Sequence, residues 1–240
     1  MTRKNRFFAI VTVLFFAVSS SFLCAQKKSV RPGINDHFKN PNVASFVERF
    51  EREGREVYDL RHKIVELVGV KAGLIVADVG AGTGMFTRLF AKKVGSTGKV
   101  YAVDIAKNFL ERIEKTSQEQ GSKNVTTILC TQNDSKLPEN SVDIVFICDT
   151  YHHFEFPYKT MKTIRKALKP KGKLVVIDFE RIEGVSSKFI MGHVRAGKTV
   201  FTHEIKQVGF KQIAKKDILK ENYFVIFEKA KPKVGAKGSE

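Results

Sequence analysis

Tryptophan is absent from the 240-residue sequence, cysteine occurs three times, and no internal repeat is visible. Single-strand nucleic-acid platforms interleave arginines with aromatic residues, and neither this pattern nor another nucleic-acid-binding module is present, so a nucleic-acid partner is disfavoured. Only two cysteines, Cys130 and Cys148, lie beyond residue 25. That number is too small to indicate an oxidising or a reducing compartment.

Acidic residues are also scarce. The 25 Asp and Glu stand against 42 Lys and Arg, which gives a formal net charge of +17. Such a charge attracts anionic partners. The lysines are spread along the chain rather than gathered in one motif, so the first interpretation is a solvated basic surface. Peripheral contact with an anionic membrane is the second.

Long hydrophobic runs are missing except near the N-terminus, where Phe7–Val18 carries no charge. Basic residues precede this run, and a segment of mostly small residues that ends at Ala25 follows it, which is the layout of a secretory signal. The run is short for a membrane span. We therefore expect residues 1–25 to be a cleaved signal peptide and the mature protein to be exported to a periplasm or another extracytoplasmic face. An uncleaved N-terminal membrane anchor is the alternative.

The remaining sequence predicts one α/β domain. Hydrophobic residues make up 42% of the chain and include 20 Phe, enough for a single core. Helical and strand patterns alternate, which is typical of a mostly parallel sheet with helices on both faces. The expected organisation is a linker at 26–42, the domain at 43–229 and a basic flexible tail at 230–240. The expected strands are 74–79, 99–104, 125–130, 142–148, 173–179, 210–217 and 222–229, and the expected helices are 84–94, 107–120, one from 157 to before Pro170, and 202–208, after a helical segment at 41–69 that Gly54 divides.

The most informative segment is the motif D-V-G-A-G-T-G, which begins at Asp78 where a strand is expected to end. Gly80, Gly82 and Gly84 let the backbone turn sharply and approach a ligand closely. The third glycine comes one residue too early for the G-x-G-x-x-G spacing of dinucleotide sites. Asp78 would repel a pyrophosphate and favours a positive group, and Asp104, at the end of the next strand, can accept hydrogen bonds from ribose hydroxyls. Together these residues predict a site for a cationic nucleoside.

This pattern resembles the first two motifs of the class I S-adenosylmethionine-dependent methyltransferases. Four further motifs follow in the order and spacing of the ubiquinone/menaquinone C-methyltransferase-like branch, a methyltransferase type 11-like domain: Asn133–Pro138, Ser141–Phe146, Tyr151–Phe154 and Ala167–Leu174. The resemblance covers roughly residues 43–229. It implies a Rossmann-like three-layer sandwich, in which a mostly parallel seven-stranded sheet has an antiparallel edge strand, and S-adenosyl-L-methionine as the cofactor.

The resemblance also implies a set of cofactor-binding residues. These are Asp78, Gly80, Ala81, Gly82, Thr83 and Gly84 for the amino acid part, Asp104 for the ribose, Ile105 for the adenine ring, Asn133 or Asp134 for the adenine amino group, and Asp149 beside the methyl donor.

Tyr151, His152 and His153 follow the fourth expected strand, at the sheet edge where open α/β folds bind ligands. One of them is our candidate catalytic base, because histidine titrates near working pH and can take a proton from a phenol, an enol or an ammonium. No metal site is expected, since adjacent histidines in a strand-end loop tend to point apart and Asp149 is assigned to the cofactor. His193 and Arg195, in the less regular last third, are candidates to reach over the acceptor pocket, and a surface helix is the alternative interpretation of this segment.

The sequence thus predicts a methyltransferase that moves the methyl group of S-adenosylmethionine to a small-molecule or lipid acceptor. A quinone-like compound, a phenol and a headgroup amine all fit this prediction, and the motifs do not choose between them. The alternative is a non-catalytic protein that binds S-adenosylmethionine or S-adenosylhomocysteine, because an export signal conflicts with a cofactor made in the cytosol. The sequence does not indicate an oligomeric state.

Overall fold

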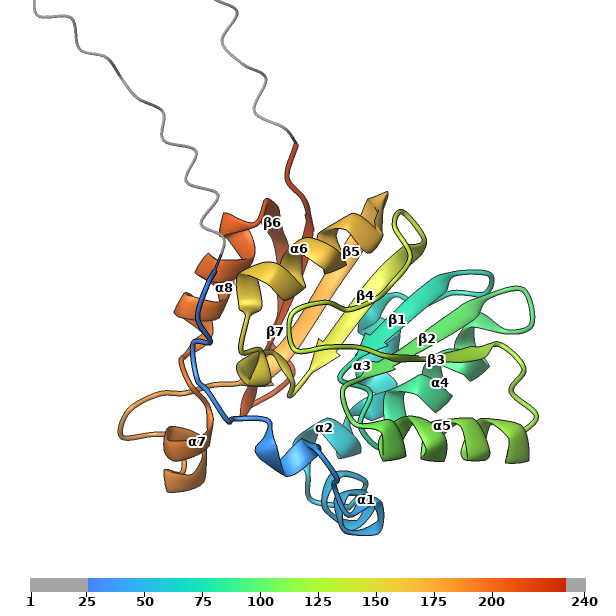
Figure 1. Cartoon of the computed structure of the whole chain (residues 1–240), viewed down its shortest axis with the longest axis horizontal. Coiled ribbons are helices and arrows are strands. Elements are labelled where there is room, and N and C mark those ends of the chain that lie inside the picture. Colours follow the sequence, from blue (N-terminus) through green and yellow to red (C-terminus); the bar gives the residue numbers. More distant parts are fainter. Residues whose placement is uncertain (1–25, 232–240) are drawn as a thin grey trace, which may run out of the picture.

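The computed structural model describes residues 26–231 of the chain. The expected signal peptide and most of the expected tail lie outside these described residues. The described part forms one seven-stranded sheet in the order β3-β2-β1-β4-β5-β7-β6 (Figure 1). The strands are β1 Ile75–Val79, β2 Lys99–Asp104, β3 Val125–Leu129, β4 Val142–Cys148, β5 Leu168–Phe179, β6 Phe210–Lys216 and β7 Asn222–Lys229.

Strand direction agrees with the prediction. The pairs from β3 across to β5 are parallel. By contrast, β7 runs antiparallel to both β5 and β6. The mostly parallel sheet with antiparallel pairing at one edge, expected from the resemblance, is therefore confirmed.

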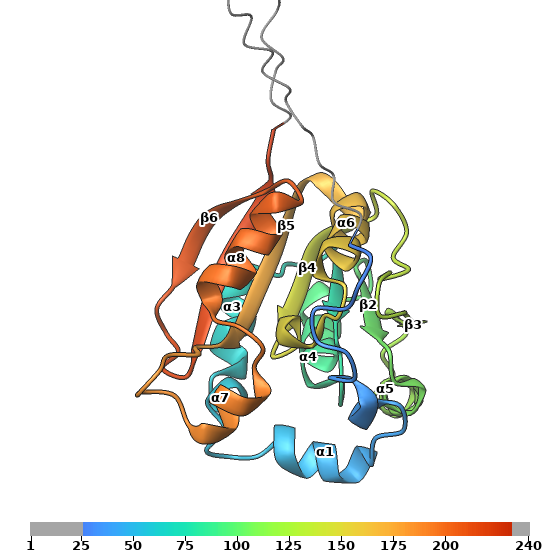
Figure 2. The same ribbon diagram turned by 60° about the vertical axis from the view of Figure 1, so that its left-hand side comes forward.

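Helices cover both faces of the sheet (Figures 1 and 2). Helices α3, α4 and α5 lie on one face, and α6 and α8 lie on the other. The short elements η1, α1, α2 and α7 gather near the end of the sheet where β1 and β4 finish. The bounds are η1 Asp36–Phe38, α1 Val43–Phe50, α2 Glu56–Asp59, α3 Arg61–Val68, α4 Met85–Val94, α5 Lys107–Glu119, η2 Tyr151–His153, α6 Pro157–Ala167, α7 Lys188–His193 and α8 Lys198–Gln207.

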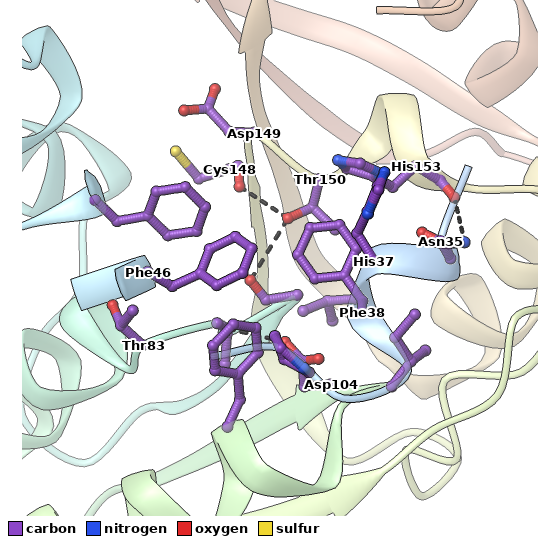
Figure 3. A pocket seen from close by; sticks show the side chains of 18 of the residues that line it. Asn35, His37, Phe38, Phe46, Thr83, Asp104, Cys148, Asp149, Thr150 and His153 are labelled. Carbon is purple, nitrogen blue, oxygen red and sulfur yellow. Dashed lines mark hydrogen bonds between the residues drawn. The ribbon is translucent and has the colours of Figure 1, made fainter. Parts of the chain in front are cut away.

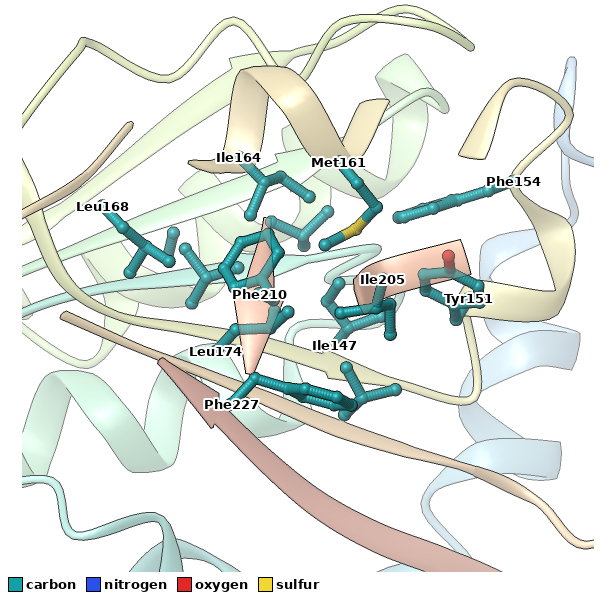
Figure 4. Packing of buried hydrophobic residues seen from close by; sticks show 14 of the residues in the cluster. Ile147, Tyr151, Phe154, Met161, Ile164, Leu168, Leu174, Ile205, Phe210 and Phe227 are labelled. Carbon is teal, nitrogen blue, oxygen red and sulfur yellow. The ribbon is translucent and has the colours of Figure 1, made fainter. Parts of the chain in front are cut away.

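The central strands are apolar on both faces because both faces are covered. In β4, Val145 and Ile147 belong to the core under α6 and α8 (Figure 4), whereas Ile144 and Phe146 belong to the core under α3 and α4. This alternation is the two-residue period of a strand. The two cores hold the sheet rigid beneath the loops that follow its strands.

Two expected elements differ from those observed. The helical segment expected at 41–69 is three short helices, because the chain leaves helical geometry at Glu51 and Gly54 adopts a φ of +83°. Strand β5 begins at Leu168 rather than at residue 173, and its pairing with β4 shifts register between Val142 and Ile144. The early start extends β5 through Pro170, which the sequence pattern marks as a break.

The strand order creates a switch point between β1 and β4. The chain winds outward from β1 to β3, then returns to place β4 on the other side of β1. Connections from the two central strands therefore leave toward opposite faces, which opens a crevice at their carboxyl ends. Within residues 26–231, no helix has the length and apolar character needed to cross a membrane.

Candidate active site

A cavity of about 760 Å³ lies at the carboxyl ends of β1, β2 and β4. Its floor is the glycine loop after β1, and its far end is formed by η2 and α7. The remaining wall comes from the N-terminal segment, which includes part of the stretch expected to be a linker. Figure 3 shows Phe38 and Phe46 from this segment turned toward Asp104, Asp149 and His153.

The glycine loop presents bare backbone to the cavity. Gly80 has a φ of +74°, and a Cβ at this position would overlap the side chain of Thr150, which follows β4. Gly80 and Gly82, with Ala81 and Thr83 beside them, line the cavity, as the sequence predicts. Gly84 does not line it.

Gly84 instead has a packing role. It caps α4 with a φ of +80°, and a Cβ there would come within 2.6 Å of Ile113 in α5. A glycine is needed here because α4 and α5 approach each other closely, and not because of ligand contact.

Asp104 ties the glycine loop to the end of β2. Its Oδ2 accepts a hydrogen bond from the Gly82 N–H at 2.8 Å, and its Oδ1 accepts one from the Ala106 N–H at 2.8 Å. The carboxylate is buried, which raises its pKa, while these backbone donors oppose the shift. Asp104 and Ile105 both line the cavity, so the expected ribose and adenine positions lie side by side.

Asp78 is the second buried acid in the loop. Its Oδ2 accepts a hydrogen bond from the Thr87 hydroxyl at 2.6 Å. Burial raises the pKa of Asp78 to about 7, and the nearby charge of Asp104 adds to the shift. A positively charged ligand in the cavity would favour the ionised Asp78 carboxylate. The sequence predicts such a ligand, a cationic nucleoside, beside Asp78.

This pKa gives a testable pH dependence. We expect the affinity for S-adenosylmethionine to fall about tenfold for each pH unit below about pH 7 and to level off above it. Below the folded pKa the Asp78 carboxyl is neutral, and a cation that requires the carboxylate must then displace a proton. Calorimetric titration of the cofactor from about pH 5 to about pH 8 measures the slope. Asp78→Asn should bind weakly with a flat profile, and a flat profile in the unmodified protein would refute the role of Asp78.

Asp149 lies at the end of β4 with a φ of +48°. Arg55, between α1 and α2, forms an ion pair with its Oδ2 at 2.5 Å, and the Asn222 side chain donates to its Oδ1 at 2.6 Å. Burial raises the pKa of Asp149, and the guanidinium of Arg55 opposes that shift. Asp149 lines the cavity, and its ion pair with Arg55 joins the segment between α1 and α2 to the end of β4.

The adenine end differs from the expectation. Thr131 and Gln132 line the cavity, whereas Asn133 and Asp134 do not. Asp134 pairs with Thr131 in an isolated bridge, and its carboxylate accepts from the Lys136 N–H. The tight turn directs both expected residues away from the ligand space. We therefore remove Asn133 and Asp134 from the candidate cofactor contacts.

The three candidate bases do not share one environment. They form the 3₁₀ turn η2, in which successive side chains are about 120° apart. Tyr151 is fully buried between Phe154 and Phe201 and does not line the cavity. Tyr151 therefore leaves the candidate site, and its role is packing. His152 and His153 both line the cavity.

His152 is held by a buried acid. Asp178 Oδ1 lies 2.7 Å from His152 Nδ1, and Asp178 Oδ2 accepts from the His152 backbone N–H at 3.0 Å. On the other side of the ring, His152 Nε2 lies 3.2 Å from Nε2 of His193 in α7. The structure thus places Asp178, His152 and His193 in one row.

Burial lowers the pKa values of the other two histidines, His153 and His193. Burial, together with the neighbouring charges of His152 and His193, lowers the pKa of His153 to about 2. Burial also lowers the pKa of His193 to about 4. A group with such a pKa takes up protons poorly at neutral pH. His152, the one of the three whose ring is bonded to a buried carboxylate, is our base candidate.

Sequence reasoning missed several parts of the site. Asp178 is the penultimate residue of β5, and only its position beside the end of the neighbouring strand signals a contact with His152. Arg55 lines the cavity, and Asn222 contacts Asp149 from β7, near the other end of the domain. Phenylalanines form the cover, with ring centroids 5.5 Å apart for Phe38 and Phe46 and 5.1 Å apart for Phe46 and Phe50.

The fold and the site define a class of protein: an α/β enzyme with a nucleoside-cofactor pocket at the switch point of its sheet. The backbone cradle and the two buried acids fit S-adenosylmethionine, since they offer a bare loop, a ribose acceptor and a counter-charge. A family model described as a methyltransferase domain matches residues 70–231. The chain belongs to this methyltransferase domain family, and its cofactor is S-adenosylmethionine.

Individual relatives are also methyltransferases by name. The ubiquinone/menaquinone biosynthesis C-methyltransferase UbiE of Hydrogenovibrio crunogenus is 33% identical over 124 residues, which cover 51% of this chain and 48% of that protein. UbiE of Pseudomonas aeruginosa strain LESB58 is 31% identical over 118 residues, 49% of this chain and 46% of that protein. The chain thus spans about half the length of the curated relatives it matches.

Among solved structures, a SAM-dependent methyltransferase from Aquifex aeolicus superposes with a TM-score of 0.68 and 26% identity. The match covers 76% of this chain and 96% of that chain. The family and this neighbour place the protein among the S-adenosylmethionine-dependent methyltransferases.

Proposed function

We propose that this protein methylates a small aromatic acceptor with an ionisable hydroxyl, of the quinol or phenol type. The observation that carries the proposal is one cavity with a cofactor cradle at one end, a His152–Asp178 pair at the other and a phenylalanine cover between them. The UbiE relatives, named for quinone biosynthesis, support the same acceptor class.

The size and lining of the cavity favour this acceptor. Its volume of about 760 Å³ lies well within the range of about 300–1,000 Å³ for small-molecule sites, and a cofactor and a ring compound must share it. Phe38, Phe46 and Phe109 form edge and tilted ring contacts with one another at centroid distances of 5.4–6.4 Å. Such ring faces and edges suit a flat aromatic molecule.

The residues of the chain then have separate tasks. S-adenosylmethionine supplies an electrophilic methyl group when bound. The phenylalanine cover excludes water and holds the acceptor against the cofactor cradle. Positioning the reactants and excluding water account for much of the rate enhancement of a displacement reaction. His152 takes up the proton that the acceptor loses, and Asp178 stabilises the resulting imidazolium and fixes the ring.

Methyl transfer from a labelled cofactor tests this proposal. The full chain is incubated with methyl-labelled S-adenosylmethionine and a panel of naphthohydroquinones, substituted phenols and ethanolamine headgroups, and mass spectrometry identifies the product. We expect one added methyl group on a quinol or phenol and none on the amine. Methylation of the amine alone would overturn the acceptor class, and cofactor binding without any methylated product would favour the non-catalytic alternative.

A further inference from the structure

Four of the six histidines line the cavity, and three of them converge at the η2 and α7 end. One ring nitrogen from each of His152, His153 and His193 lies within 4.8 Å of the other two. We infer that these three imidazoles form a binding site for one divalent transition-metal ion of the zinc type, open toward the acceptor space. This proposal departs from the expectation that no metal site exists.

The expectation assumed a local geometry that differs from the one observed. Adjacent residues in an extended strand point to opposite sides, but His152 and His153 are on a 3₁₀ turn, which brings two of its three side chains to the same cavity. Their ring centroids are 4.2 Å apart, and each ring lies 5.0 Å from that of His193. The third ligand comes from a helix 40 residues later in the chain, which no local pattern reveals.

The distances suit a tetrahedral ion. Zinc binds imidazole nitrogen at about 2.0–2.1 Å, so two such ligands on one tetrahedral ion are about 3.4 Å apart. The Nε2 atoms of His152 and His193 are 3.2 Å apart. The contributing nitrogen of His153 lies within 4.8 Å of the other two, so a shift of at most about 1.4 Å brings it to the same spacing.

The partners around the histidines match those of metal ligands. Asp178 bonds the far nitrogen of His152, as carboxylates do for ligating histidines, and this fixes the Nε2 lone pair toward the centre of the cluster. The His193 backbone is held in turn, because Arg31 donates to the carbonyls of Gly192 and His193 at 2.8 and 2.7 Å. His153 Nδ1 is buried without a hydrogen-bond partner among the described residues, which is an unusual state for a buried nitrogen.

Three imidazoles favour zinc, copper, nickel or iron over magnesium or calcium. Three protein ligands with an open fourth position are the arrangement of catalytic rather than structural zinc. The open side faces the cavity, where an acceptor oxygen would complete the coordination and lose its proton more readily. This placement rests on the proposed function. With the ion bound, His152 acts as a ligand and not as the proton acceptor, and the acceptor releases its proton to solvent when its oxygen binds the ion.

Calorimetric titration of the full chain, prepared without a histidine tag and stripped of metal, with zinc chloride tests the site. We expect one zinc per chain. Asp178→Asn should weaken binding about 10–100-fold, and His193→Ala should weaken it more. His203→Ala is the matched control, because His203 is exposed on α8 and bonds only Gln207; its zinc affinity should equal that of the unmodified protein. Cobalt absorption of the tetrahedral type provides a second readout.

The outcomes separate this inference from the proposed function. Unchanged cofactor affinity in each variant shows that the fold is intact. The metal site is refuted if zinc does not bind, or if His193→Ala binds as tightly as His203→Ala. In that case, if methylation proceeds unchanged in the presence of a chelator, the proposed function still holds, with His152 as a metal-free base. Zinc binding without methylation of any acceptor would support the site and refute the function.

Discussion

Replacing Asp104 with alanine should weaken S-adenosylmethionine binding by about 100-fold or more. Hydrogen bonds to a charged group contribute about 1.5–3 kcal/mol each, and the ribose offers two hydroxyls. Two such bonds amount to at least about 3 kcal/mol, or about two orders of magnitude in the dissociation constant. Calorimetric titration of the variant with the cofactor measures the loss.

A second effect adds to the first. Asp104 also accepts the Gly82 and Ala106 N–H groups, so alanine leaves both donors without their carboxylate and loosens the glycine loop. Asp104→Asn, which keeps one oxygen acceptor, should lie between alanine and the unmodified protein. Asp217→Ala is the matched control, because Asp217 is exposed and pairs only with Lys215. An unchanged affinity in Asp104→Ala, with an unchanged melting temperature, would remove Asp104 from the site.

The central part of the fold could be predicted because each element carries its own signal. Strand β4 is apolar apart from Asp143, and its observed bounds are those expected, 142–148. Strand β2 also matches, since a lysine begins it and Asp104 ends it. The N-terminal helices could not be resolved, because α1, α2 and α3 are separated by the capping geometry of Glu51, Gly54 and Leu60 rather than by a change of hydrophobic period.

The candidate site also contains residues that the sequence could indicate and residues that it could not. Asp78, Asp104 and Gly80 are encoded by a contiguous motif whose backbone geometry is local, so the sequence places them correctly in the cavity. Asn133 and Asp134 lie in a turn whose direction depends on one isolated bridge, and no pattern in the sequence specifies that bridge. The motif therefore indicates the segment but not the residue that faces the ligand.

Long-range contacts account for the rest. The Asp178 carboxylate reaches His152 from a neighbouring strand, and His193 reaches it from a helix beyond that strand. Arg55 crosses the cavity to Asp149 from the opposite end of the domain. Each contact joins segments separated by 26 or more residues, and only the folded sheet brings them together.

Replacing His152 with alanine should lower turnover by about 10²–10⁴-fold while it leaves the affinity for S-adenosylmethionine within about twofold. The reason is spatial. His152 contacts Asp178 and His193, whereas the cofactor cradle is built from the loop after β1 and from Asp104. The same loss is expected whether His152 acts as a free base or as a metal ligand. Single-turnover rates, measured beside calorimetric affinities for the cofactor, separate the two effects.

The choice of variants guards against a purely structural explanation. Asp178→Asn keeps the shape of the buried side chain but removes the charge that favours a protonated or ligating His152, so its turnover should fall at cofactor affinity near that of the unmodified protein. His203→Ala, on the exposed face of α8, should alter neither quantity. If His152→Ala lost cofactor affinity by the same factor as turnover, His152 would support the shape of the cavity and not the reaction. A group that acts only on the acceptor does not change the affinity for the cofactor to that extent.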